Sequence, residues 1–205
     1  QSLCARAETA LGGIGGVVLV ALPGRQVALV GSFTFLLIGC AAPEPRPAGV
    51  GLKLAPAALA ESISLQQLLD IEGQGRSAQL DVVLEVDAAR IDLVGLALGH
   101  RVLSLHYDGE TLQSWRHPMW PAQLRAEEVL ENLQLTLWPV DAIRQALPVG
   151  WSIEESGLRR TILQDGLAIM VIDYSGLPLW SGKVEVTNLQ FNYRITVQSV
   201  PMSLK

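Results

Sequence analysis

The stretch Gln79-Leu80-Asp81-Val82-Val83-Leu84-Glu85-Val86-Asp87 decides the fold class of this chain. Apolar side chains occupy every second position in it, and only Val83 departs from the alternation. A period of two places successive side chains on opposite faces of a β-strand. We therefore predict that this stretch is a strand with one buried face and one face toward water.

Similar alternation extends on both sides and divides most of the chain into short strands. The expected strands are residues 69–72, 79–87, 91–94, 102–107, 112–115, 158–164, 167–174, 183–189 and 191–200. Asp108-Gly109 and Asp165-Gly166 separate two pairs of them, and both dipeptides favour a two-residue type I′ turn because they tolerate positive φ. About ten short strands joined by tight turns predict an antiparallel meander.

Residues 125–147 interrupt the strands with a helical pattern. Leucines and a valine within 125–137 recur at the spacing of one helix face. Pro139 ends that run and suits the first turn of a second helix over residues 139–147. A short helix is also expected at 56–63, and the sheet is expected to coil around the helices.

Two of the expected strands are apolar on both faces. Residues 93–98 and 169–172 have almost no polar side chain, and a sheet with one wet face does not need this composition. Either these strands are central and covered on both sides, or one of their faces lines an apolar cavity. An ordinary two-layer core is the third interpretation.

The composition changes abruptly after Leu36-Leu37-Ile38-Gly39-Cys40. An apolar run over residues 27–38 ends in a small residue and a cysteine, and the proline-rich polar stretch 41–47 follows. This order is typical of a bacterial lipoprotein signal, whose cysteine accepts a diacylglycerol and becomes the new amino terminus. A buried strand with a chance cysteine and a membrane helix are the alternatives, although the run is too short to span a bilayer.

The lipoprotein interpretation divides the chain into three parts. Residues 1–39 are expected to be the signal segment, of which 1–24 represent an over-long gene start or a truncated leader. Cys40 is the predicted lipidation site, and residues 40–55 form a flexible tether. Residues 56–205 are then a single folded domain, large enough to form its own core.

The charge balance restricts the partners of this domain. With 15 Lys and Arg against 20 Asp and Glu, the chain has a formal net charge of −5 at pH 7. This balance argues against nucleic acid as a partner and against a basic face for anionic lipid. Cys4 and Cys40 both precede the expected domain, so no disulfide or thiol chemistry is expected within it.

No group of residues predicts catalysis or metal binding. His100, His106 and His117 lack the spacing and the accompanying ligands of a metal site. The acidic pairs Glu127-Glu128 and Glu154-Glu155 are adjacent residues whose side chains point apart, so we expect them in solvent. No Gly-x-Ser-x-Gly motif occurs. We expect no metal, no cofactor and no enzymatic activity.

Several stretches carry a resemblance to a known family. They are Leu-Trp-Pro-Val-Asp-Ala-Ile-Arg-Gln-Ala-Leu-Pro at 137–148, Trp-Ser-Ile-Glu-Glu-Ser at 151–156, Asn-Leu-Gln-Phe at 188–191 and Tyr-Arg-Ile-Thr-Val at 193–197. The chain resembles the LolA/LolB group of periplasmic lipoprotein carriers, and most closely an uncharacterised LolB-like family encoded near aryl-polyene pigment genes. Within this group LolB is a lipoprotein and LolA is soluble, so the predicted lipidation site makes the chain more similar to LolB.

The resemblance implies a mainly β (α+β) fold. It would be a curved antiparallel half-barrel of about ten or eleven strands, closed by about three helices around an apolar cavity. The family's ligands are acyl chains, and removing each CH₂ from water gains roughly 0.8 kcal/mol. The candidates for lining this cavity are Leu84, Leu93, Leu105, Trp115, Trp120, Leu133, Leu137, Trp138, Ile143, Leu147 and Ile172.

The resemblance also implies a membrane-insertion loop, because LolB has an exposed apolar residue on a loop between its early strands. The matching turn here is residues 95–100, where Leu96 and Leu98 are the candidates. Leu98 is favoured because Gly99 places it at the tip of the turn. Packing of both leucines within their strands is the alternative.

Together these features predict a monomeric lipoprotein anchored in the outer membrane and facing the periplasm. Ala41 replaces the aspartate that retains many lipoproteins at the inner membrane. Such a protein would bind lipid, acyl or polyene-lipid cargo and pass it to the membrane, and a LolA-like carrier is a candidate partner. The alternative is a scaffold lipoprotein of an envelope or pigment-biosynthesis complex, with a filled core.

Overall fold

The computed structural model describes residues 49–73, 75–118, 120 and 125–202. The predicted signal segment, Cys40 and the first part of the tether lie outside these residues. Residues 50–55, which the sequence analysis assigned to the flexible tether, pack onto the domain. Val50 and Leu52 are only 9% and 3% exposed, so residues 50–55 belong to the packed domain and not to a flexible tether.

In the described part of the chain, ten antiparallel strands form one open sheet in the order β5-β4-β3-β2-β1-β10-β9-β8-β7-β6. The strands are β1 (Ile63–Gly73), β2 (Arg76–Val86), β3 (Ile91–Ala97), β4 (His100–Tyr107), β5 (Leu112–Arg116), β6 (Trp151–Ser156), β7 (Arg159–Gln164), β8 (Leu167–Tyr174), β9 (Gly182–Asn188) and β10 (Tyr193–Pro201). The predictions of a mainly β fold and about ten strands are confirmed.

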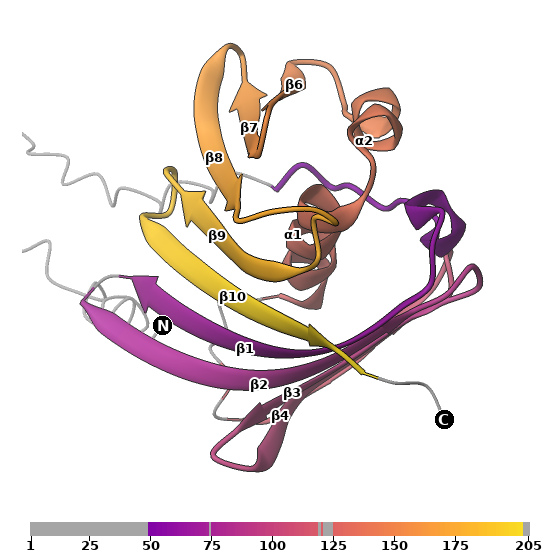
Figure 1. The fold of residues 1–205 in the computed structure, drawn as a ribbon, viewed down its shortest axis with the longest axis vertical. Helices are drawn as coiled ribbons and strands as arrows, with labels where there is room; N and C mark the ends of the chain where they lie inside the picture. Colours follow the sequence, from indigo (N-terminus) through magenta and orange to yellow (C-terminus); the bar gives the residue numbers. More distant parts are fainter. Residues whose placement is uncertain (1–48, 74, 119, 121–124, 203–205) are drawn as a thin grey trace, which may run out of the picture. The chain divides into compact units, whose positions relative to one another are not determined.

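The sheet is not the single meander that was expected. The first five strands form one meander and the last five form another, and β1 joins them by pairing with β10. Consecutive strands form a hairpin only across a short connection. The helical block separates β5 from β6, and these two strands become the opposite edges of the sheet (Figure 1).

Within the described residues there are two α-helices, α1 (Ala126–Leu137) and α2 (Val140–Ala146). The third predicted helix, over residues 56–63, is a single 3-10 turn, η1 (Pro56–Leu59). Ala60 ends it with a left-handed φ of 65°, and Ile63 already pairs with Val86 in the sheet. The expectation of about three closing helices is therefore not confirmed.

The two Asp-Gly turns have different outcomes. Asp165 and Gly166 have φ values of 50° and 80° and join β7 to β8 with two residues, so the predicted type I′ turn is confirmed. Around Asp108 the prediction is wrong, because Tyr107 pairs with Leu112 and leaves a four-residue loop. The Asp108 carboxylate accepts the amides of residues 110 and 111 and closes that longer loop itself.

The core lies on the sheet face that α1 covers. In β2, the alternate residues from Leu80 to Val86 are buried, whereas Val83 faces the other way and is half-buried. Leu130 and Leu135 of α1 pack into the same cluster. In Figure 1, strands β1–β4 lie below α1 and strands β7 and β8 lie above it.

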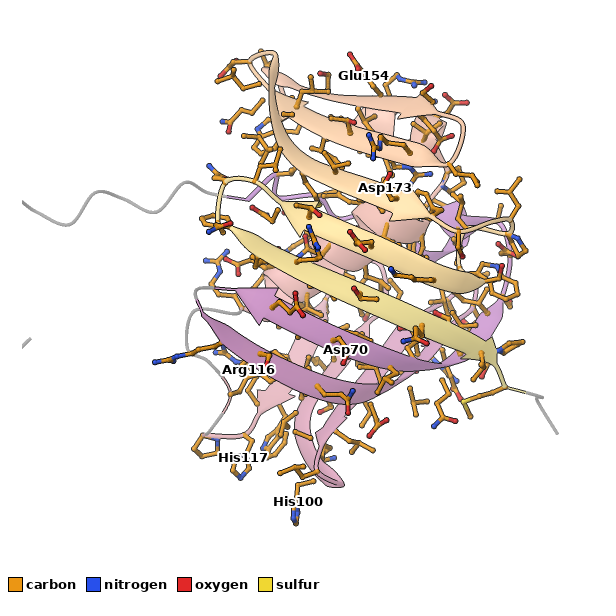
Figure 2. The ribbon with its side chains drawn as sticks, turned by 60° about the vertical axis from the view of Figure 1, so that its left-hand side comes forward. Asp70, His100, Arg116, His117, Glu154 and Asp173 are labelled. Carbon is orange, nitrogen blue, oxygen red and sulfur yellow. The ribbon has the colours of Figure 1, made fainter. Side chains whose placement is uncertain are left out.

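The strands that are apolar on both faces belong to an ordinary core on one side only. In β3, Ile91 and Leu93 face the core, while Val94 and Leu96 are half-buried on the outer face. The remainder of the outer face is more polar. Asp70 and Asp173, for example, lie on it in Figure 2.

Adjacent positions in β2 provide a test of this inward–outward assignment. Leu84→Ala should lower the free energy of unfolding by about 2–5 kcal/mol, because Leu84 is fully buried. Val83→Ala should cost less than about 1 kcal/mol, because Val83 lies on the outer face. Urea unfolding of both variants measures the difference, and equal losses would contradict the assigned face.

Candidate functional site

The candidate site is the interior between α1 and the sheet. Most of the predicted cavity residues do lie there, and seven of them are buried: Leu84, Leu93, Leu105, Leu137, Trp138, Ile143 and Ile172. Leu133, Leu147 and Trp120 are half-buried and pack against the same cluster. The structure therefore brings ten of the candidates together in one apolar interior.

Trp115 is the exception. It pairs with Ser104 on the strand face opposite to buried Leu105, so it lies on the outer face of the sheet and is 42% exposed. The guanidinium carbon of Arg101 lies 4.6 Å from the centre of its ring, which is the geometry of a cation–π contact. Trp115 is therefore removed from the group of cavity-lining residues.

The side chains beneath α1 are closely packed, since Leu84, Leu130 and Ile172 are all 0% exposed. Two depressions of the described surface lie elsewhere. One of about 320 Å³ lies over β3, β4 and β5, and the other of about 530 Å³ surrounds Asp70, Gln79 and Thr196. No residue of α1 lines either of them.

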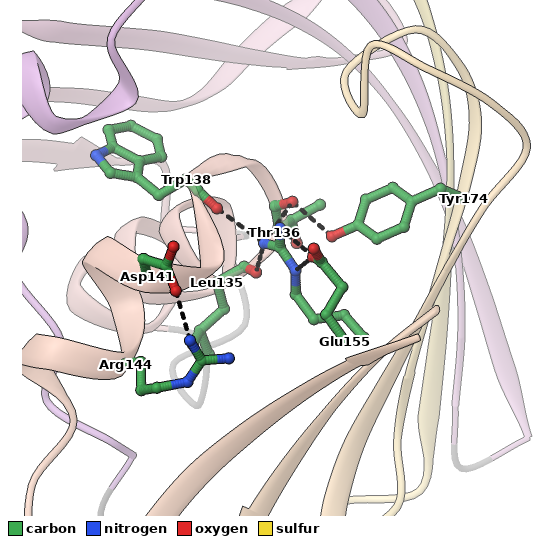
Figure 3. Close-up of polar contacts among 8 residues, drawn as sticks. Leu135, Thr136, Trp138, Asp141, Arg144, Glu155 and Tyr174 are labelled. Atoms are coloured by element: carbon green, nitrogen blue, oxygen red, sulfur yellow. Dashed lines mark hydrogen bonds and ion pairs between the residues drawn. The ribbon is translucent and has the colours of Figure 1, made fainter. Parts of the chain in front are cut away.

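A buried arginine, Arg160, fixes the C-terminal end of α1 to the sheet. Figure 3 shows Leu135, Thr136 and Trp138 at this end of the helix, with Glu155 and Tyr174 beside them. Arg160 of β7 is 1% exposed, and its Nη1 donates to the carbonyls of Leu135, Thr136 and Trp138 at 2.9, 3.3 and 2.9 Å. The last carbonyls of a helix lack partners within the helix and carry a partial negative charge. A guanidinium satisfies both the hydrogen bonds and the charge.

Two neighbours complete this arrangement, which we call the Arg160 latch: Arg160, Glu155 and Tyr174 with the carbonyls at the end of α1. Glu155 of β6 accepts from Nε and Nη2 of Arg160 at 2.8 and 2.7 Å, so the buried cation has a counter-charge. The Tyr174 hydroxyl donates to the Thr136 carbonyl at 2.6 Å. Burial raises the pKa of Tyr174, which keeps the hydroxyl protonated and able to donate.

The sequence analysis did not identify the Arg160 latch, although one signal for it was present. Arg160 and Ile162 are two residues apart in a strand, so they share a face, and that face is inward. An arginine in an inward position needs buried acceptors. What the pattern could not provide is the identity of those acceptors, which come from α1.

The two leucines of the predicted membrane-insertion turn differ in their exposure to solvent. Leu98 and Gly99 form the two-residue connection between β3 and β4 with φ values of 51° and 77°, and Leu98 is 98% exposed. Leu96 is half-buried on the outer face of β3, beside Asp81. Only Leu98 therefore has the exposure that insertion would require.

The histidines lie on the surface. His106 contacts Asp92 at 2.7 Å between Nδ1 and Oδ1, while His100 and His117 project from one end of the sheet in Figure 2. Among the residues that the structure describes, no three His, Cys, Asp or Glu side chains form a group that could hold a metal ion. The same residues include no helix with the length and apolar character needed to cross a membrane.

The chain was compared with models of known protein families, and one of them matches most of the described domain. The model of a family described as "Protein of unknown function (DUF3261)" matches residues 64–201. The chain belongs to this family. The matched region runs from β1 to the end of β10 and so contains α1, the Arg160 latch and the Leu98 turn, whereas Cys40 lies outside it. No curated protein matches the chain.

Adjacent arginines in β7 test the latch of this DUF3261 chain. Arg160→Ala should lower the free energy of unfolding by about 3–5 kcal/mol, because it leaves Glu155 without its counter-charge and the helix carbonyls without their donor. Arg159→Ala is the matched control and should cost less than about 1 kcal/mol, since the Arg159 side chain is 61% exposed beside Asp173. Chemical denaturation measures both, and similar losses would show that Arg160 does not hold α1.

Proposed function

We propose that this protein is a LolB-like lipoprotein, anchored through Cys40 to the outer membrane and facing the periplasm. It would hold lipid, acyl or polyene-lipid cargo between α1 and the sheet and pass that cargo to the membrane. A LolA-like carrier would be the partner that delivers the cargo. This role needs no covalent chemistry and no cofactor.

The observation that carries the proposal is how α1 is attached. Its end is fixed by hydrogen bonds from Arg160 and Tyr174, over an interior of leucine, isoleucine and tryptophan. Hydrogen bonds at a helix end can be exchanged for water when the helix lifts, whereas the exposed interior requires another apolar cover. About ten buried methylenes of an acyl chain would supply roughly 8 kcal/mol toward that exchange.

The sheet geometry agrees with this role. An open antiparallel sheet with α1 against one face can act as a half-barrel whose helical side opens. We infer a curved half-barrel of the LolA/LolB kind, with α1 as the moving cover. Each edge of the sheet, β5 and β6, can then separate from α1 without breaking the central β1–β10 pairing.

Leu98 would provide contact with the bilayer. An exposed leucine at a turn tip gains up to about 1.5–3 kcal/mol when it enters an apolar phase. A lipid anchor at Cys40 would keep the domain at the membrane, where Leu98 could insert and cargo would be released.

A second function has its own support. The interior is filled by the protein's own side chains, and the clearest depressions lie over the outer sides of strands. These observations favour a scaffold lipoprotein that binds protein partners of an envelope or pigment-biosynthesis complex. In that case α1 would never open.

Bound lipid distinguishes the two functions. We expect mass spectrometry of the purified protein to detect acyl-bearing molecules, and we expect a fluorescent fatty acid to bind with a blue-shifted emission. Arg160→Lys, which keeps the charge but loses the forked geometry, should bind the probe faster. A lipid-free spectrum together with no uptake by either protein would reject the carrier and favour the scaffold.

The Leu98 turn has a separate test. Leu98→Glu should slow delivery of a fluorescent acyl cargo to liposomes about tenfold, because a charge at the tip opposes insertion. Leu177→Glu is the matched control, since Leu177 is a 75% exposed leucine in the loop between β8 and β9. Equal delivery by both variants would remove the turn from the mechanism and leave cargo binding untouched.

A further inference from the structure

Residues 50–55, which we call the strap, are bound along one face of α1 (Figure 1, indigo). Three side chains at intervals of three and four residues hold it: Glu131, Gln134 and Trp138. This spacing places all three on the same side of the helix. The strap lies between the predicted lipidation site and η1, and with Gly49 it is the first part of the chain that the structure describes.

The hydrogen bonds from these three side chains all go to backbone groups of the strap. Glu131 accepts the amides of Val50 and Gly51 at 2.9 and 2.7 Å. The fully buried Gln134 accepts the amide of Leu54 at 2.9 Å and donates to its carbonyl at 2.7 Å, as a neighbouring β-strand would. Trp138 Nε1 donates to the Ala55 carbonyl at 3.2 Å.

Two glycines make this geometry possible. Gly51 has a φ of 74°, a left-handed conformation that glycine adopts without strain, and its amide is one of the two that donate to Glu131. A Cβ at Gly49 would lie 2.9 Å from Oε1 of Glu131, so a side chain at this position would displace the carboxylate that binds the strap. The local sequence is therefore fitted to the helix face.

The strap and α1 depend on each other for their polar partners. If the strap left while α1 stayed in place, the amide of Gln134 would lose both of its protein partners, and the core would lose the packing of Val50 and Leu52. Both losses reduce what holds α1 in its place. Release of the strap therefore favours movement of α1, and movement of α1 requires release of the strap.

We infer that the strap is a brake on α1, which holds the helix closed until the strap leaves the face formed by Glu131, Gln134 and Trp138. This inference deepens the proposed carrier function and rests on it for its purpose, because it assigns the control of opening to the segment nearest the anchor. A pull from the membrane side would act on the strap first.

Amide hydrogen exchange of the full chain tests the brake without reference to cargo. Gly51→Ala and Glu131→Gln alter the contact from its two sides, and each should raise exchange of the α1 amides about tenfold. Gly75→Ala is the matched glycine control, because Gly75 has a φ of 73° and, like Gly51, open space around it. Glu127→Gln, on the same helix but away from the strap, is the matched acidic control.

The outcomes separate the brake from the proposed function. If exchange rises in residues 50–55 while α1 keeps wild-type protection in both strap variants, the brake is overturned. If α1 exchange rises and the fluorescent fatty acid binds faster, both inferences are supported. If α1 exchange rises but no variant takes up fatty acid, the brake stands and the carrier function fails. Near-ultraviolet circular dichroism checks that each variant is folded.

Discussion

The structure depends on the pairing of a buried guanidinium with the buried C-terminal end of a helix. No basic residue lies in the last turn of α1, and the chain leaves the helix in an extended conformation at Trp138. The helix therefore has no means of its own to satisfy its last carbonyls, and Arg160 of the sheet provides it. Glu155 offsets the cost of burying the cation. Without this group, the helix end and the arginine would both be buried without partners.

That dependence explains what sequence reasoning could and could not reach. Period-two patterns located the strands because each strand is half-buried by one face, and the turn at Asp165-Gly166 followed from the φ values those residues tolerate. Nonlocal pairings had no such signal. The pairing of β1 with β10, the acceptors of Arg160 and the backbone contacts of Gln134 join residues far apart in the chain. At Asp108 a local side-chain bond overrode the expected turn.

The same distinction applies to the candidate site. Apolar spacing identified most of the interior because the core and a lipid-binding interior have the same composition. Trp115 was wrongly included because the sheet face on which it lies depends on the residue that it pairs with in the next strand. That residue is Ser104, which faces away from the core. A pattern of hydrophobic residues thus predicts most of the side chains that are buried, while the polar contacts that hold α1 over them had to come from the structure.

Trp138 connects the two sets of polar contacts. Its carbonyl accepts from Arg160 at 2.9 Å, and its indole Nε1 donates to Ala55 of the strap at 3.2 Å. Its side chain is fully buried in the core. Because its buried side chain is held in the core, a movement of its backbone would displace both contacts. In the proposed carrier, the latch and the strap would therefore act on α1 together, and both would have to give way before the helix could open.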